Sequence, residues 1–124
     1  MFKDLNPIIH SQLRLAIISF LVANGKSDFK EIKEVTKATS GNISVQLKKL
    51  EEAGYVRITK GFLNNYQHTA IEITPIGIQA FEEYVQAIKA YLLELRREEK
   101  LIDTDRKGAK KEGKKEGKRR RVLE

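Results

Sequence analysis

Apolar residues in the first third of the chain recur three or four positions apart, and this spacing predicts two helices. The first is expected over about residues 5–23, and Ser11 could cap a second start after a short turn. Asn24-Gly25 should end it, because glycine tolerates the left-handed backbone of a helix stop. The second helix is expected to begin at Ser27 or Asp28. It is short, so it must depend on packing against neighbouring elements.

A third helix is predicted over about residues 41–53, with two unlike faces. Ile43, Leu47 and Leu50 are spaced by four and three residues and form its apolar stripe. Gly54 is expected to terminate it. The remaining positions of this helix are polar for the most part, so we expect them to lie in solvent.

After residue 54 the periodicity changes from helical to strand-like. Strand-forming residues follow Gly54 directly and recur over residues 68–74. The interval of residues 61–67 is turn-prone and is centred on Asn64-Asn65. These features predict a β-hairpin whose strands are joined by a loop of several residues.

Thr74-Pro75 is expected to open a long last helix that ends at about residues 97–100. Its apolar positions are spaced alternately by three and four residues, as in a coiled-coil seam. The seam contains more apolar side chains than a single helix needs to cover the core of one small domain. We therefore expect part of the seam to pack on the chain's own first helix, and its C-terminal half to lie between two copies. The predicted dimer residues are Phe81, Val85, Ile88, Tyr91, Leu92 and Leu95.

The predicted fold is mainly α with a small β-hairpin (α+β), in the order of a winged helix-turn-helix with a long C-terminal dimerisation helix. Three stretches carry a more specific likeness. They are Leu5-Asn-Pro-Ile-Ile-His-Ser11 with Arg14-Leu15, Ser40-Gly-Asn-Ile-Ser-Val-Gln-Leu-Lys-Lys-Leu-Glu-Glu-Ala-Gly-Tyr-Val56, and Thr69 through Thr74-Pro-Ile-Gly77. In these the chain resembles the short single-domain winged-helix regulators related to the MarR and ArsR groups. The resemblance implies a homodimeric, sequence-specific regulator that binds double-stranded DNA.

The outer face of the third helix supports the same function on chemical grounds. Amides and hydroxyls read base edges, lysines bind phosphates or guanine, and an apolar side chain can contact the thymine methyl group. In a helix-turn-helix, this helix enters the major groove. The predicted contacts on this helix are Ser40, Asn42, Ser44, Val45, Gln46, Lys48 and Lys49.

The hairpin is the predicted wing, but its tip is not basic. The resemblance implies Arg or Lys at this position, whereas no basic residue follows Lys60 in the loop. Asn64 and Asn65 are candidate minor-groove contacts, since amides also serve there. Arg57 and Lys60 are candidate phosphate contacts. Alternatively, the loop's apolar side chains form a patch for a partner or for the last helix; these are Phe62, Leu63 and Tyr66.

The net charge of +7 is confined to the end of the chain. Residues 106–124 contain ten Lys or Arg and three Glu, while residues 1–105 contain fourteen charges of each sign. We therefore predict a winged-helix domain over residues 1–100 and a basic, disordered tail over residues 101–124. The tail is either an electrostatic arm for DNA or a solvated charge run.

Several function classes lack support in the sequence. The chain contains no cysteine, and His10 and His68 have no ligand pattern near them, so we expect neither a metal site nor a cofactor. No catalytic motif is present, and we expect a protein that is not an enzyme. There is no apolar run of membrane-spanning length and no signal-peptide layout, so a cytoplasmic location is expected. A small-molecule effector is possible, but no residue indicates one.

Two other functions remain open at the level of sequence. A winged-helix module for protein–protein contact would suit the neutral core and the non-basic wing. A nonspecific nucleic-acid binder driven by the tail would suit the charge distribution. The preference for one duplex over random duplex distinguishes these functions from a sequence-specific regulator.

Overall fold

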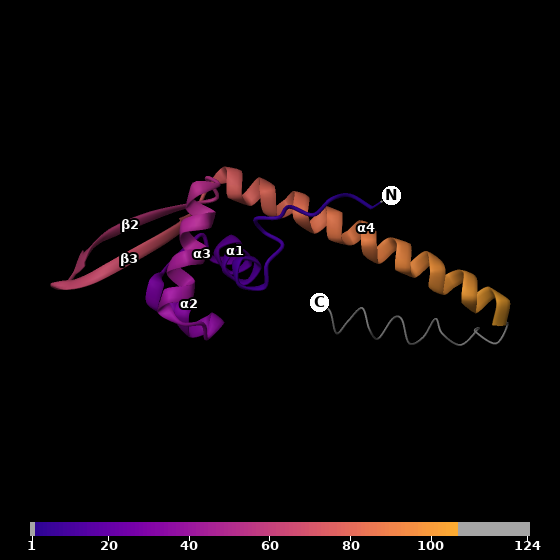
Figure 1. Ribbon diagram of the computed structural model, residues 1–124, viewed down its shortest axis with the longest axis horizontal. Helices are drawn as coiled ribbons and strands as arrows, with labels where there is room; N and C mark the ends of the chain where they lie inside the picture. The colour runs from indigo at the N-terminus through magenta and orange to yellow at the C-terminus, as the bar shows by residue number, and fades with distance from the viewer. Residues whose placement is uncertain (1, 107–124) are drawn as a thin grey trace. The chain divides into compact units, whose positions relative to one another are not determined.

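The computed structural model describes residues 2–106, with side chains described up to residue 97. Most of the predicted tail lies outside the described residues. Its elements are α1 (Gln12–Asn24), β1 (Lys26–Asp28), α2 (Phe29–Thr36), α3 (Ser40–Glu52), β2 (Val56–Leu63), β3 (Tyr66–Ile73) and α4 (Pro75–Arg106) (Figure 1). This is the winged-helix fold that the order of elements predicted.

The first helix begins later than the apolar pattern suggested. α1 starts at Gln12, and the residues before it form a separate turn. Asn6 holds this turn, because its Oδ1 accepts hydrogen bonds from the backbone N–H groups of Ile8 (2.8 Å) and Ile9 (3.2 Å). The Asn6-Pro7 signal therefore caps one turn and not the long helix. The start at residue 5 was wrong for that reason, whereas the alternative start after Ser11 is confirmed.

The sheet has a third strand that the sequence did not reveal. β1 pairs antiparallel with β3, which places β3 between β1 and β2. Lys26-Ser27-Asp28 has no apolar alternation, so only its pairing with residues 70–72 makes it a strand. Asp28 then caps α2, since its Oδ1 accepts a hydrogen bond from the backbone N–H of Glu31 at 2.8 Å.

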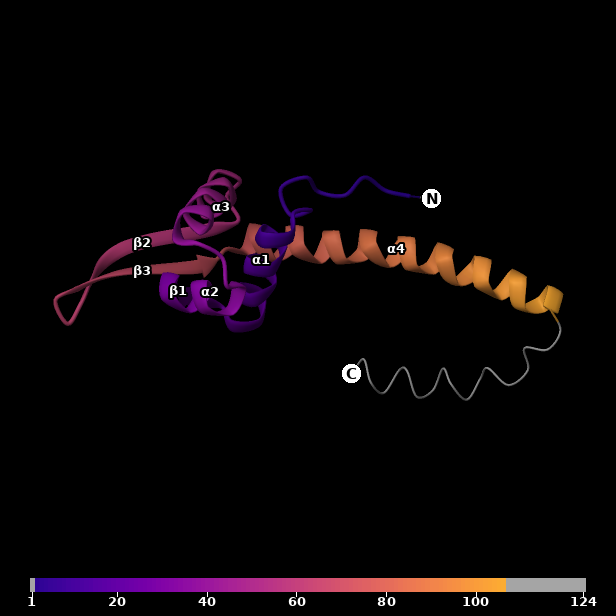
Figure 2. The ribbon, with the colours of Figure 1, turned by 60° about the horizontal axis from the view of Figure 1, so that its bottom comes forward.

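The strands of the hairpin are longer and its turn is tighter than predicted. The strands pair out to Leu63 and Tyr66, so only Asn64 and Asn65 form the turn. Both have positive φ, at 52° and 69°. These are the values of a two-residue type I′ turn, whose twist suits antiparallel strands and which asparagine tolerates. The expected loop over residues 61–67 is therefore a paired ribbon with a short tip, visible in Figures 1 and 2.

The core joins all three short helices to the sheet. Its fully buried side chains come from the turn before α1, from α1, α2 and α3, and from β3: Ile9, Ile17, Ile18, Leu21, Ile32, Ile43, Leu50 and Ile71. The predicted stripe of α3 is confirmed, since Leu47 is also buried. Anchored in this way, α3 keeps its opposite face in solvent.

The last helix begins as predicted and continues further. Thr74 Oγ1 accepts a hydrogen bond from the backbone N–H of Gly77 at 3.0 Å and donates one to the carbonyl of Gly54 at 2.7 Å. The chain forms two compact units, one ending at Ile88 and one beginning at Lys89. Within the first unit, the buried side of α4 consists of small residues and one tyrosine: Gly77, Ala80, Tyr84 and Ala87.

Candidate nucleic-acid interface

The exposed arc of α3 divides into two edges on either side of Val45, which is 53% exposed. Helical geometry places Ser40, Ser44 and Lys48 along one edge. Asn42 and Gln46 lie along the other edge, toward Lys49. All the predicted residues of this helix are exposed except Gln46, which is half-buried.

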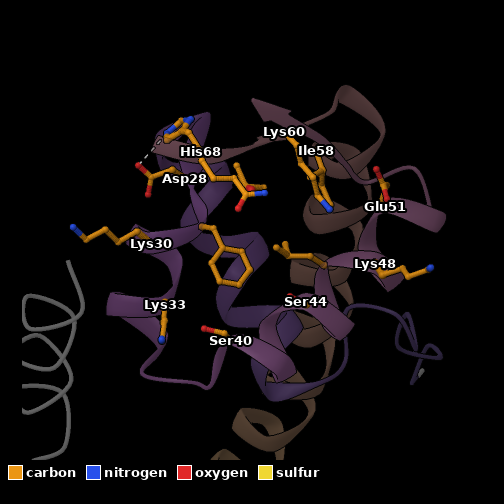
Figure 3. A pocket seen from close by; sticks show the side chains of 14 residues that line it. Asp28, Lys30, Lys33, Ser40, Ser44, Lys48, Glu51, Ile58, Lys60 and His68 are labelled. Atoms are coloured by element: carbon orange, nitrogen blue, oxygen red, sulfur yellow. Dashed lines mark ion pairs between the residues drawn. The ribbon is translucent and has the colours of Figure 1, made fainter. Parts of the chain in front are cut away.

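The first edge of α3 borders a lysine-lined groove of about 1030 Å³. α2, α3 and the β2–β3 hairpin form its walls, as Figure 3 shows. Its cationic side chains are Lys30 and Lys33 from α2, Lys48 from α3 and Lys60 from β2. Ser40 and Ser44 add hydroxyls at the same groove. Two carboxylates, Asp28 and Glu51, also line the groove, so the lysines outnumber the acidic side chains by four to two. Ammonium and hydroxyl groups are suited to phosphate oxygens.

Strand alternation explains how the hairpin contributes to this groove. Val56 and Ile58 pair with Ile73 and Ile71 on the face that packs against the core. The same face continues along β2, two residues at a time, to Lys60. The core-facing side of the sheet therefore becomes a wall of the groove where the hairpin extends beyond the helices.

Arg57 lies on the opposite face of the sheet. It is paired across the strands with Glu72, with 3.4 Å between Arg57 Nη1 and Glu72 Oε1, and both side chains are at least half exposed. Of the two strand cations predicted to contact phosphate, the fold therefore brings only Lys60 into the groove beside α3.

The second edge of α3 is tied to α1 through a third cation. Gln46 Oε1 accepts a hydrogen bond from Arg14 Nη1, and Gln46 Nε2 donates one to Asn42 Oδ1 at 2.9 Å. Arg14 Nε also donates to the backbone carbonyl of Ile8 at 2.5 Å. Two of the predicted reading residues are therefore linked to each other and held by a guanidinium.

The tip of the wing is exposed and apolar. Phe62, Leu63 and Tyr66 are 78%, 57% and 77% exposed. The hypothesis that they form a patch for a partner or for the last helix stays a prediction. Asn64 and Asn65 form the turn between them and are exposed as well. The tip thus offers two amides and three apolar side chains in place of a cation.

The two histidines have hydrogen-bonding or ionic partners within the fold. His68 Nε2 lies 3.5 Å from Asp28 Oδ2 at the rim of the groove (Figure 3). His10 Nδ1 lies 2.8 Å from the hydroxyl of Tyr84. In the described part of the chain, no three metal-ligating side chains gather.

Apolar side chains also remain exposed along α4 beyond the first unit. Leu92, Leu93 and Leu95 are 55%, 58% and 54% exposed, and Tyr91 is 38% exposed. In the first unit, by contrast, Phe81 and Ile88 pack against the chain's own core. The predicted seam therefore falls into a covered part and an exposed part.

A second hollow of about 440 Å³ lies between the N-terminal segment and α4. Its two tyrosine hydroxyls already have partners, since Tyr55 accepts a hydrogen bond from Asn6 at 2.9 Å and Tyr84 contacts His10. The predictions about a small-molecule effector stay untested. Across residues 2–106, we find no helix with the length and apolar character that a bilayer crossing requires.

Sequence reasoning missed the contributions of α1 and α2 to this surface. Arg14 had no recognisable signal, because its partner Gln46 is distant in sequence. Lys30 and Lys33 were detectable in principle, since they are exposed and lie three residues apart on a short helix whose buried residue is Ile32. Only the packing of α2 beside α3 assigns these two lysines to the groove.

Comparison with known proteins agrees with this architecture. A family model described as a winged helix DNA-binding domain matches residues 13–92. The chain belongs to the winged helix DNA-binding domain family. An uncharacterized protein of Methanocaldococcus jannaschii is 36% identical over 81 residues, which cover 65% of this chain and 88% of that protein.

Two solved structures place the fold among regulators. A transcriptional regulator homologue from Pyrococcus horikoshii OT3 is 29% identical, with a TM-score of 0.69, over 73% of this chain and 89% of that chain. The transcriptional regulator BldR from Sulfolobus solfataricus is 22% identical, with a TM-score of 0.58, over 78% of this chain and 71% of that chain, which supports the fold alone. The resemblance to small winged-helix regulators is confirmed.

Proposed function

We propose that this winged-helix protein is a transcriptional regulator that binds double-stranded DNA sequence-specifically as a homodimer. The observation that carries the proposal is the surface that α3 shares with α2 and the hairpin. A groove that contains Lys30, Lys33, Lys48 and Lys60 borders one edge of the polar arc of α3. Base-reading side chains and phosphate-binding cations thus lie side by side on a chain of neutral net charge up to residue 105.

In this proposal the two edges of α3 have different roles. The edge bordering the groove, with Ser44 and Lys48, contacts phosphates and fixes the position of the helix. The edge with Asn42 and Gln46 reads base edges in the major groove. Asn64 and Asn65 at the wing tip contact the minor groove.

The homodimer is supported by the exposed leucines of α4. A helix with Leu92, Leu93 and Leu95 more than half exposed in one copy has apolar area to bury against a second copy. A two-fold dimer presents two copies of α3, which a two-fold symmetric operator requires. Sedimentation of the native chain at micromolar concentration should show a dimer, and Leu92→Glu with Leu95→Glu should show a monomer.

The decisive experiment is a fluorescence anisotropy titration with duplex from the region upstream of the protein's own gene. Random duplex of equal length serves as competitor, at about 150 mM salt, with the full chain and a chain ending at residue 106 in parallel. We expect selective binding by at least about 10³-fold that survives removal of the tail. An Asn42→Ala, Gln46→Ala variant should lose the selectivity. Unselective binding that vanishes with the tail would contradict the proposal.

One observation favours a second function, contact with another protein. The exposed Phe62, Leu63 and Tyr66 make an apolar tip that phosphates do not attract. If neither form of the chain binds the upstream duplex selectively, this protein-contact module becomes the better explanation.

A further inference from the structure

The hydrogen bonds among Arg14, Gln46 and Asn42 have a fixed direction. A guanidinium has N–H donors and no acceptor, so the group of Gln46 that faces Arg14 is the amide oxygen. The amide nitrogen of Gln46 is then the end nearer Asn42, and it donates to Asn42 Oδ1 at 2.9 Å. The cation at one end thereby sets the orientation of both amides.

Arg14 is itself held in place. Besides Gln46, it donates to the carbonyl of Ile8 at 2.5 Å and to that of Pro7 at 3.4 Å. These carbonyls belong to the turn that Asn6 caps, and Ile9 in that turn is fully buried. These hydrogen bonds fix the guanidinium to a segment that is anchored in the core. Both Arg14 and Gln46 are half-buried.

This orientation determines which hydrogen-bonding groups remain for a ligand. The oxygens of both amides already accept one bond each, which leaves each oxygen one lone pair. Uncommitted N–H groups remain, two on Asn42 and one on Gln46, since an amide nitrogen carries two hydrogens. Asn42 is exposed in the first turn of α3. The edge thus presents neighbouring donors.

We propose that Arg14 is a positioning residue that makes this edge of α3 select guanine. The inference rests on the proposed function, because it concerns the base that α3 reads. Guanine is the base whose major-groove edge carries two neighbouring acceptors, N7 and O6. Adenine offers one acceptor, N7, beside its amino donor, and thymine offers one acceptor beside a methyl group. Cytosine presents an amino donor, so each of these three bases accepts fewer N–H groups at this edge than guanine does.

The test reverses the orientation without removing the contact with Arg14. In Gln46→Glu, the carboxylate still accepts from the guanidinium but has no N–H for Asn42. The amide of Asn42 should then turn, donate to Glu and present its oxygen to the base. We expect the preferred base at this position to change from guanine to adenine or cytosine. Selection from a random duplex library with the full native chain and with Gln46→Glu measures this change.

The base pair that this edge contacts is identified as the position of the DNA site whose base preference disappears in Asn42→Ala. There the native chain should prefer guanine on the order of tenfold. Arg14→Met should reduce the ratio of guanine to the other bases toward one at this position. The base preferences at the other positions of the DNA site should stay unchanged. If Arg14→Met fails to fold in a thermal melt, Gln46→Glu still tests the inference because it keeps the contact with α1.

A matched control separates orientation from charge. Lys30→Gln changes the net charge by the same amount as Gln46→Glu, on the groove side of the interface. It should weaken binding to all duplexes and keep the base preference, because phosphate contacts carry no sequence information. A native preference for adenine or cytosine at this position, or guanine retained in Gln46→Glu, would overturn the inference. A native chain that selects no duplex would overturn the proposed function as well.

Discussion

The outer face of α3 and the tip of the β2–β3 hairpin both lie in solvent, yet their side chains differ in kind. The face of α3 is polar and stands on three buried anchors, Ile43, Leu47 and Leu50. The tip carries exposed Phe62 and Tyr66 and has no buried anchor of its own. Burying a large apolar side chain contributes about 1.5–3 kcal/mol. Burial of Ile43, Leu47 and Leu50 stabilises the folded chain. Phe62 and Tyr66 would contribute burial free energy only when a partner covers the tip.

The largest expected effect tests this contrast in stability. Ile43→Ala should lower the free energy of unfolding by about 2–5 kcal/mol, because it leaves a cavity under α3. Phe62→Ala should change it by less than about 0.5 kcal/mol, because the ring is 78% exposed. Urea denaturation followed by circular dichroism measures both. A large loss in Phe62→Ala would mean that the tip is part of the core.

The contrast extends to electrostatics. Lys30→Ala with Lys33→Ala should reduce the slope of log K against log salt by about 1.8, since each lost phosphate contact contributes about 0.9. Phe62→Ala with Tyr66→Ala should leave that slope unchanged, because neither side chain is charged. Anisotropy titrations over a series of salt concentrations compare the two variants. Equal slopes in the lysine variant and the native chain would exclude α2 from the DNA interface.

A smaller effect is expected where the two regions are joined. Thr74, at the base of the hairpin, donates to the carbonyl of Gly54, which follows α3, and caps α4. Thr74→Ala should lower stability by about 1–2 kcal/mol through the lost cap. Thr74→Ser keeps the hydroxyl and serves as the control in thermal melts. If both variants lose the same stability, the methyl group and not the hydroxyl is responsible.

The smallest expected effect concerns the turn of the wing. Asn65→Gly should raise stability by about 0.5 kcal/mol, because glycine has no Cβ to strain at a φ of 69°. Asn65→Ala should change it in the opposite direction, since alanine has neither that freedom nor the amide. The two melting temperatures, compared with that of the native chain, check the turn assignment. An increase in Asn65→Ala would argue against the positive φ.

Local patterns predicted α3 and the start of α4 well, because their signals lie within one helix turn. The spacing of apolar residues within α3 was enough to predict its buried stripe. The Thr74-Pro75 pair was enough to predict where α4 begins. The start of α1 was predicted too early, because an Asn-Pro pair caps a single turn as readily as a long helix. The hairpin turn was predicted too long, because Phe62 and Tyr66 were read as loop residues although they pair across the strands as far as the turn.

The amino-acid sequence by itself determined which face of α3 is buried, where α1 and α3 end and that the excess charge lies after residue 105. These depend on neighbours in the chain. The tertiary structure alone decided that Lys26–Asp28 is a strand, that Lys30 and Lys33 share a groove with α3, and that Arg14 orients Gln46. Each of those relations joins residues from separate elements. Hydrogen bonds and charge act over a few ångströms of space, whatever the separation in sequence.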